Sequence, residues 1–256
     1  MKMSGTTILI TGGGSGIGLG LAKEFLELGN KVIITGRSQQ KLKAAAQIGL
    51  EVCSMDMTKT QEIQKGVKDI LAQWPSLNIV IHNAGIMKTE RLTVENSDTI
   101  QTETITTNLL GPMRLTDALL PHFLKKDYAA ILTVTSGLAY LPLAMTPSYC
   151  ASKAGLHSYT ESLRYQLKNL PIDVIEIAPP YVQTELTGAH QATDPNAMPL
   201  DEFISEVMEI LKTKPDITEV LVKRVHPLRF SFEGGHEKYL NFFNQFNDHM
   251  TAQRDS

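Results

Sequence analysis

The chain has 256 residues, of which 42% are hydrophobic and 20% are charged, and its formal net charge is −3. This composition is ordinary for a globular protein, and the slight negative charge gives no bulk attraction to nucleic acid or anionic membranes. No Lys/Arg run exceeds two residues, and no apolar run approaches the roughly 18 residues that would span a bilayer. We therefore predict no nucleic-acid partner and no integral membrane segment.

The two cysteines and the first residues bear on location. Cys53 and Cys150 form no Cys-x-x-Cys pair, which is typical of thiols in a reducing compartment. Residues 1–7 lack the long apolar core of a signal peptide. We therefore expect a cytoplasmic protein. A chain of this length can fold without a disulfide or a structural metal, and we expect no metal site.

The first third of the chain alternates between two patterns. Short apolar runs rich in β-branched residues are typical of buried strands, and they fall at 7–11, 31–35, 50–54 and 78–82. Apolar residues at helical spacing lie between these runs, and they predict helices at 16–28, 40–47 and 60–74.

The same alternation continues further along the chain. We predict further strands at 129–135, 172–178 and, more weakly, 219–225. Further helices are expected at 97–126, with a possible bend at Pro112, and at 148–169. Alternating strands and helices with short connections favour a parallel sheet covered on both faces. We therefore predict an α/β protein with one Rossmann-fold domain over 1–256, a doubly wound parallel sheet of about seven strands.

Two segments interrupt this alternation. The first, 184–215, begins with a loop-like stretch and is expected to form a substrate loop and helix. The second is an aromatic tail, 226–256, with helical spacing of Tyr239, Leu240, Phe242, Phe243 and Phe246. Its apolar face could pack on its own subunit, join two subunits or cover the active site. A membrane-surface helix is less favoured because the polar face carries few basic residues.

A glycine-rich turn follows the first predicted strand and precedes a helix. Its candidate ligand-binding residues are Gly12, Gly14, Ser15, Gly16, Ile17 and Gly18. Gly12 permits a tight turn, Gly16 lets the backbone approach a pyrophosphate, and Gly18 allows the helix to pack closely on the strand. The helix N-terminus offers free N–H groups to phosphates. This context predicts a dinucleotide site.

The end of the second predicted strand indicates which dinucleotide is bound. An NAD site usually carries an acidic residue there, whereas this chain has Gly36 and Arg37. Because a guanidinium can pair with a 2′-phosphate, we predict NADP(H). The alternative is that Arg37 is a solvated surface side chain. Asp56 could accept from the adenine amino group or cap the next helix, and Asn83-Ala84-Gly85 could lie against a ribose.

Four residues in the middle of the chain suggest proton transfer. Tyr149 and Lys153 are four residues apart on one helix face, and an ammonium beside a phenol favours the phenolate. Ser136 ends a predicted strand and could hold a substrate oxygen. Asn108 lies mid-helix, where it could bind a water that passes protons to Lys153. An isolated Tyr-x-x-x-Lys pair is also common on helix surfaces, so the set as a whole carries the prediction.

These residues resemble the short-chain dehydrogenase/reductase family over about 70% of the chain, from Thr6 to about Thr184. The resemblance rests on the glycine turn, Asn83-Ala84-Gly85, Pro179 and the Asn108-Ser136-Tyr149-Lys153 set. It implies that Tyr149 transfers a proton, that Ser136 orients substrate and that Lys153 also holds the nicotinamide ribose. It also implies a homodimer or homotetramer. The expected cofactor contacts further include Met57, Val182 and Thr184. With its unusual tail, the chain is most similar to the bacterial DltE-type members.

Three departures from the family pattern stand out. His82 occupies a position where the family usually has Asn, which we interpret as a conservative change at a strand end. Pro180 replaces a glycine and is expected to stiffen the wall near the nicotinamide. The usual glycine-rich C-terminal motif is missing, which puts the family's common tetramer interface in doubt.

We therefore predict an NADP(H)-dependent oxidoreductase that interconverts a carbonyl and an alcohol on a small molecule. Its substrate pocket is expected to be apolar and to include Leu138, Leu143, Pro180, Tyr181 and the loop 184–199. One alternative is a dinucleotide-binding sensor or partner protein with little or no catalysis. Another is dehydratase or epimerase chemistry on the same fold.

Overall fold

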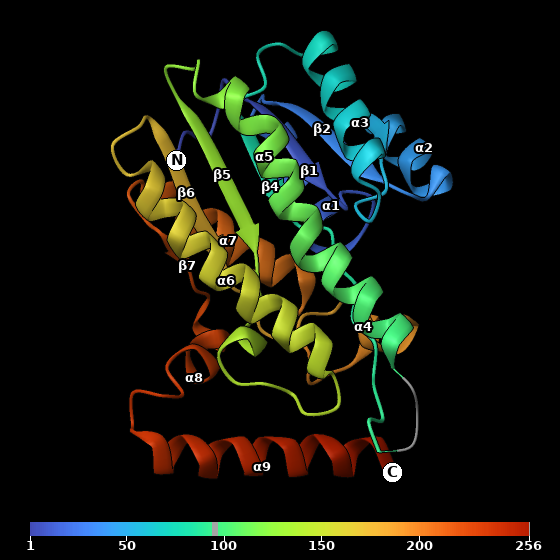
Figure 1. Ribbon diagram of the computed structural model, residues 1–256, viewed down its shortest axis with the longest axis vertical. Coiled ribbons are helices and arrows are strands. Elements are labelled where there is room, and N and C mark those ends of the chain that lie inside the picture. Colours follow the sequence, from blue (N-terminus) through green and yellow to red (C-terminus); the bar gives the residue numbers. More distant parts are fainter. Residues whose placement is uncertain (94–96, 256) are drawn as a thin grey trace.

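The structure is a computed structural model that describes residues 1–93 and 97–255. In this part of the chain seven parallel strands form one sheet, in the order β3-β2-β1-β4-β5-β6-β7 (Figure 1). The strands are β1 Thr7–Thr11, β2 Lys31–Gly36, β3 Glu51–Ser54, β4 Ile79–His82, β5 Ala129–Val134, β6 Ile172–Ile177 and β7 Glu219–Val220. The order reverses between β1 and β4, which is where an open parallel sheet binds its ligands.

The helices cover both faces of this sheet. They are α1 Gly16–Glu27, α2 Gln39–Gln47, α3 Thr60–Gln73, α4 Asp98–Ile105, α5 Gly111–Phe123, α6 Pro147–Leu167, α7 Leu200–Thr213, α8 His226–Arg229 and α9 His236–Asp255. The shorter helical segments are η1 Thr106–Leu110, η2 Gly137–Ala139, η3 Ala189–Thr193 and η4 Lys223–Val225. No helix within the described ranges is long and apolar enough to cross a membrane.

Two apolar cores hold the layers together. Successive side chains of a strand point to opposite faces, so Ile8 and Ile10 enter one core whereas Leu9 enters the other. Helices α1, α2 and α7 supply the first core. Helices α3, α5 and α6 supply the second, and Figure 1 shows α5 and α6 lying across the near face of the sheet. The predicted doubly wound fold is confirmed.

The predicted helix over 97–126 was wrong in one respect. The chain forms α4 and α5 separated by a π-helical segment, η1, and α5 continues through Pro112. The hydrogen bonds of η1 join residue i to residue i+5, which widens the helix. Such π-helical segments are frequent at functional sites. Asn108 lies within η1 and is fully buried.

The seventh strand is also shorter than predicted. Only Glu219 and Val220 pair with β6, and the chain then turns into η4 and α8. Val222 and Val225 are nevertheless fully buried, in the same core as α1 and α7. The apolar run 219–225 therefore reflects burial and not strand pairing.

Helix α9 is set apart from the layers around the sheet. Figure 1 shows it crossing the end of the molecule toward which β5 points. Since β5 is parallel to its neighbours, that end carries the carboxyl ends of the strands. The aromatic tail therefore lies at the end where ligands of such sheets bind.

Candidate active site

The glycine-rich turn after β1 is held by Asn83. The backbone N–H groups of Asn83 and Ala84 both donate to Thr11 Oγ1, each at 3.0 Å. Asn83 Nδ2 donates to the carbonyls of Thr11 at 3.0 Å and Gly12 at 3.2 Å. A Cβ at Gly18 would lie 2.3 Å from Asn83 Nδ2, so only glycine fits there. Asn83 thus fixes the turn, a role we did not predict for it.

Backbone conformation sets a second constraint on this turn. Gly12 and Gly16 have positive φ angles of 65° and 53°, which side chains other than glycine rarely adopt. A Cβ at Gly12 would also lie 2.8 Å from the Cα of Ala84. Ser15 precedes α1, and its side chain makes no capping hydrogen bond to the helix. Half-buried Ile17 belongs to the first turn of α1.

A cavity of about 420 Å³ opens beside the turn. It is lined by Gly12, Gly14, Ser15, Gly36, Arg37, Ser38, Lys41 and Leu42. Two lining side chains are basic and none in this set is acidic. Lys41 pairs with Glu185 at 3.2 Å, and Arg37 lies 4.0 Å from Glu103. A turn of glycines, a helix N-terminus and two cations suit the phosphates of a dinucleotide.

The segment after β3 borders the same region. Asp56 Oδ1 accepts from the N–H and the hydroxyl of Thr58, at 2.9 and 2.8 Å. Burial acts to raise the pKa of Asp56, but these hydrogen bonds and the nearby charges of Arg37 and Lys59 hold it below its usual value. The N-cap of α3 is Lys59, so the alternative that Asp56 caps that helix was wrong. Met57 is buried, and Gly111 packs closely against its backbone.

The segment after β6 brings the remaining predicted residues to the site. The Pro179 carbonyl accepts from the N–H of Gly137 at 2.8 Å. Val182 forms an isolated bridge with Met198. A Cβ at Gly16 would lie 3.4 Å from Thr184 Cγ2. Pro179 thus lies beside the residue after Ser136, and Thr184 lies against the glycine turn.

Helix α6 carries the proton-transfer pair. Tyr149 and Lys153 are 6% and 4% exposed. Lys153 Nζ donates to the Val134 carbonyl at 2.7 Å and lies 5.6 Å from the centre of the Tyr149 ring. Ser136 lies two residues after the end of β5, and its Oγ accepts from the N–H of Leu138 at 3.1 Å. The carboxyl end of β5 thus positions both Lys153 and Ser136.

Asn108 joins this group through the loop after β4. Its Oδ1 accepts from the N–H of Ile86, and its Nδ2 donates to the Ile86 carbonyl, both at 2.9 Å. Nδ2 also donates to Ser152 Oγ on α6 at 3.0 Å. A Cβ at Gly85 would lie 3.4 Å from Asn108 Oδ1 and 3.6 Å from Lys153 Nζ. The loop after β4 is therefore fixed against α6.

The electrostatics of the pair differ from our expectation. We expected Lys153 to lower the pKa of Tyr149. Burial instead raises the pKa of Tyr149 to about 12, although the Ser136 side chain acts in the opposite direction. Burial lowers the pKa of Lys153 to about 8, and the charge of Glu176 opposes that shift. In this state the phenol holds its proton at neutral pH, as a proton donor requires.

His82 ends β4 and takes no part in this group. Its Nε2 pairs with Thr116 Oγ1 on α5 at 2.9 Å. Complete burial lowers the pKa of His82 to about 3, so the ring is neutral. This placement agrees with a conservative change at the strand end.

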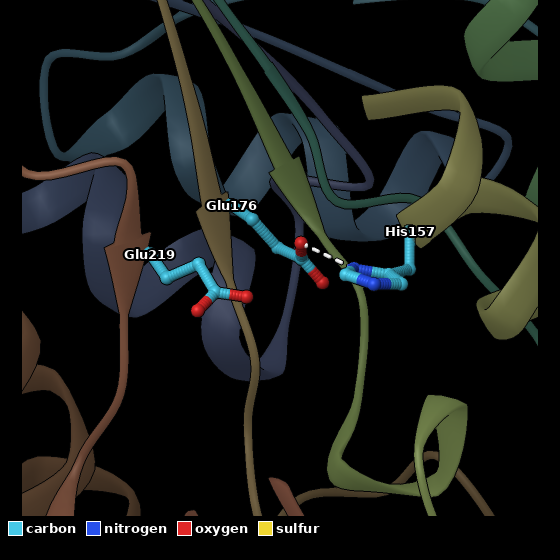
Figure 2. Close-up of side chains that lie close together, drawn as sticks. All are labelled: His157, Glu176 and Glu219. Atoms are coloured by element: carbon cyan, nitrogen blue, oxygen red, sulfur yellow. Dashed lines mark hydrogen bonds and ion pairs between the residues drawn. The ribbon is translucent and has the colours of Figure 1, made fainter. Parts of the chain in front are cut away.

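A partly buried polar network lies one helical turn beyond Lys153. Figure 2 shows His157, Glu176 and Glu219 converging from α6, β6 and β7. His157 Nδ1 pairs with Glu176 Oε2 at 2.8 Å, and Thr135 and Tyr140 donate to Glu176 Oε1. The three side chains lie close enough to hold a metal ion. Arg229, however, already pairs with Glu219 at 3.0 Å, so a cation stands beside these carboxylates.

Sequence reasoning missed several residues that border the site. Lys41 carried a usable signal, since it is a basic residue four positions after Arg37 and lies in the first turn of α2. Glu90 gave none, because only the fold brings it to the start of α6, where it accepts hydrogen bonds from Ser148. His157 and Glu176 could be paired only once strand order was known.

The fold is typical of oxidoreductases that bind a dinucleotide cofactor, and so are the glycine turn and the pair of Tyr149 and Lys153. The chain belongs to the short chain dehydrogenase family, whose pattern matches residues 6–195, and it is thus an oxidoreductase of that family. DltE of Bacillus subtilis (strain 168), described as an uncharacterized oxidoreductase, is 38% identical over 260 residues, covering 96% of this chain and 98% of DltE. The predicted resemblance to DltE-type members is confirmed.

Solved structures agree with this assignment. The chain is 25% identical to a 3-ketoacyl-(acyl-carrier-protein) reductase from Brucella melitensis complexed with NADH, with a TM-score of 0.77 over 88% of this chain and 100% of that one. It is 23% identical to a short chain dehydrogenase from Burkholderia cenocepacia J2315 in complex with NADP, with a TM-score of 0.76 over 94% and 99% of the two chains.

Proposed function

We propose that this protein is an NADP(H)-dependent oxidoreductase that interconverts a carbonyl and an alcohol on a small molecule. One observation carries the proposal. A buried phenol and a buried ammonium, Tyr149 and Lys153, lie at the same edge of the sheet as a glycine turn and a basic cavity. A redox cofactor and a proton donor beside one another are what carbonyl reduction requires.

The cofactor assignment rests on the cavity beside the glycine turn. The turn and the first turn of α1 would hold the pyrophosphate. Arg37 and Lys41 would face a 2′-phosphate, and the lining residues supply no carboxylate to bind a free 2′-hydroxyl. Similar structures contain NADH in one case and NADP in another, so the preference for NADP(H) is argued from this chain's own side chains.

The chemistry is divided between the cofactor and the protein. The bound nicotinamide would supply or accept the hydride. In reduction, the Tyr149 hydroxyl would donate its proton to the substrate oxygen, and Ser136 Oγ would hold that oxygen by a hydrogen bond. Lys153 would stabilise the phenolate left behind, because its positive charge lies beside the ring. In the oxidative direction the same phenolate would act as the base.

Fluorescence titration of the purified protein with NADPH and NADH tests the cofactor assignment. Wild type is compared with Arg37→Ala and with the matched control Arg91→Ala, whose side chain is exposed on the loop after β4. We expect NADPH to bind more tightly than NADH and the Arg37 variant to lose at least about tenfold in NADPH affinity only. Equal loss for both nucleotides, or preference for NADH, would contradict the assignment.

A carbonyl screen with NADPH tests the reaction. Sustained NADPH oxidation with an aldehyde or ketone supports the oxidoreductase. Tight NADPH binding without turnover of any carbonyl would instead support a redox sensor. Product formation with no net change in cofactor absorbance would indicate dehydratase or epimerase chemistry.

A further inference from the structure

The C-terminal segment packs on a small apolar cluster that includes Tyr149, the proton donor of the proposed reaction. Leu143, Tyr149 and Cys150 form a small buried cluster that is separate from the two main cores. Phe246 and Met250 of α9 pack on this cluster and are themselves half-buried. Of the three placements that the sequence left open for the apolar face of α9, Phe246 and Met250 show packing on the same subunit, at the cluster that includes Tyr149.

A pair of hydrogen bonds fixes α9 in this position. Asn247, which is 9% exposed, accepts from the N–H of Ala144 at 2.6 Å through Oδ1. Its Nδ2 donates to the carbonyl of Pro142 at 3.1 Å. The amide therefore pairs with the backbone of the loop between η2 and α6, as a neighbouring strand would. Asn247 lies between Phe246 and Met250 in sequence, so this anchor sets the position of both.

The start of the C-terminal segment, α8, packs on the other end of the same loop, near Gly137. A Cβ at Gly137 would lie 2.6 Å from Leu228 Cδ1, so α8 packs directly on the residue after Ser136. The Arg229 guanidinium lies 4.6 Å from the centre of the Tyr140 ring. The loop 137–146 is thus held by α8 near Ser136 and by α9 near Tyr149.

We propose that α9 forms the outer wall of the substrate site and that Phe246 and Met250 contact the substrate. This inference rests on the proposed oxidoreductase function and adds a substrate class to it. The hydrophobic side chains packed on the Tyr149 cluster are Met87, Leu138, Met145, Phe246 and Met250. A charged group placed among them would lose its hydration without gaining a partner. The preferred substrate is therefore a carbonyl compound that presents an aliphatic or aromatic group to α9.

Steady-state kinetics with a graded set of aldehydes tests this wall. NADPH oxidation is measured with propanal, octanal and benzaldehyde for wild type, Phe246→Ala and Met250→Ala. We expect each variant to raise KM for octanal and benzaldehyde roughly tenfold, since a buried apolar side chain contributes about that much to binding. The effect on propanal should be small, and kcat should change less than KM.

Controls separate this role from a general loss of structure. Leu240→Ala removes an apolar side chain from the same helix that is 43% exposed and lies outside the cluster, and its kinetics should match wild type. NADPH affinity should be unchanged in Phe246→Ala, the melting temperature should fall only slightly because Phe246 is half-buried, and Phe246→Leu should recover most of the octanal affinity. A variant that lowers turnover of all three aldehydes equally, with a lower melting temperature, would overturn the proposal.

A binding measurement keeps the two proposals distinguishable. Saturation-transfer NMR with n-octanol, without cofactor, reports contact with the apolar wall whether or not the protein turns over aldehydes. Octanol contact that is lost in Phe246→Ala but retained in Leu240→Ala supports the wall, even if no aldehyde is reduced and the proposed function fails. Octanol signal that is identical in wild type and Phe246→Ala, alongside normal aldehyde turnover, would contradict the wall and leave the function standing.

Discussion

Glu90 accepts two hydrogen bonds from Ser148, one from its backbone N–H at 3.0 Å and one from its hydroxyl at 2.9 Å. Ser148 lies in the first turn of α6, directly before Tyr149. Glu90 is only 5% exposed, and its own N–H donates to the Met145 carbonyl at 2.9 Å. A carboxylate at a helix N-terminus is also favoured by the helix dipole. Glu90 therefore positions the start of the helix that carries Tyr149.

Replacing Glu90 should consequently reduce activity without removing any group that contacts the substrate. Glu90→Ala leaves two donors of Ser148 without their partner, and we expect a loss of roughly 1–3 kcal/mol in unfolding free energy and of about tenfold or more in kcat. Glu90→Gln should recover much of both, because its carbonyl oxygen still accepts. Wild-type kcat in a folded Glu90→Ala variant would contradict this role.

Lys41 should contribute to nucleotide choice together with Arg37. It lines the basic cavity, and its ion pair with exposed Glu185 is weak enough to be exchanged for a phosphate. Lys41→Ala should weaken NADPH binding about tenfold and leave NADH binding nearly unchanged. Lys43→Ala, an exposed lysine of the same helix outside the cavity lining, is the matched control. Isothermal titration calorimetry with NADPH and NADH measures both affinities. An equal loss of NADPH affinity in Lys41→Ala and Lys43→Ala would refute the prediction.

The rate of carbonyl reduction should fall as pH rises through about 8. Burial lowers the pKa of Lys153 to about 8, so its positive charge is present below that pH and is lost above it. Tyr149, whose pKa is raised to about 12, keeps its proton throughout this range. The phenolate formed on proton donation thus loses its stabilising charge at high pH. A kcat profile measured with saturating NADPH should decline above pH 8, whereas residual activity of Lys153→Arg should show no such break.

The pair of His157 and Glu176 should make stability depend on pH. The hydrogen bond that Glu176 accepts raises the pKa of His157 above 6.5. The contribution of His157 to stability is therefore complete below pH 6.5 and is lost as pH rises through the raised pKa. Burial acts to raise the pKa of Glu176, but hydrogen bonds from His157 and Thr135 lower it. The contribution of Glu176 to stability is therefore lost only at acid pH. His157 and Glu176 are therefore both charged at pH values between these two pKa values.

Urea unfolding of His157→Gln measures this dependence. We expect the variant to lose roughly 1–3 kcal/mol near pH 6 and less at higher pH, where wild-type His157 also becomes neutral. The control His236→Gln, at the exposed start of α9, should leave the unfolding free energy unchanged near pH 6 and at higher pH. A loss for His157→Gln that does not change with pH would show that its charge is irrelevant.

Much of the fold could be predicted because its signals are local. Strands such as 7–11 are continuous apolar runs, and the glycine turn combines three local demands at Gly12, Gly16 and Gly18. The π-helical turn at Asn108 could not be predicted, since the contacts of Asn108 there are with Ile86 and Ser152, which lie far away in sequence. The predicted seventh strand, 219–225, was too long because buried valines look alike in a strand and in irregular backbone.

The site was predictable where one motif holds several groups, and less so where distant segments meet. Tyr149 and Lys153 share a helix face, so their proximity follows from spacing alone. The raised pKa of Tyr149 depends on burial under residues far away in sequence, among them Phe246 and Met250. Asn247 gave no signal either, because its partners are backbone groups of a loop more than a hundred residues earlier.

The most direct test of the central proposal is NADPH oxidation by Tyr149→Phe with whichever carbonyl substrate the screen yields. The substitution removes only the phenolic oxygen, so NADPH affinity and melting temperature should stay close to wild type. We predict that kcat falls at least about a hundredfold, as expected for loss of a general acid. Turnover within a few-fold of wild type, in a variant that binds NADPH normally, would show that Tyr149 is not the proton donor.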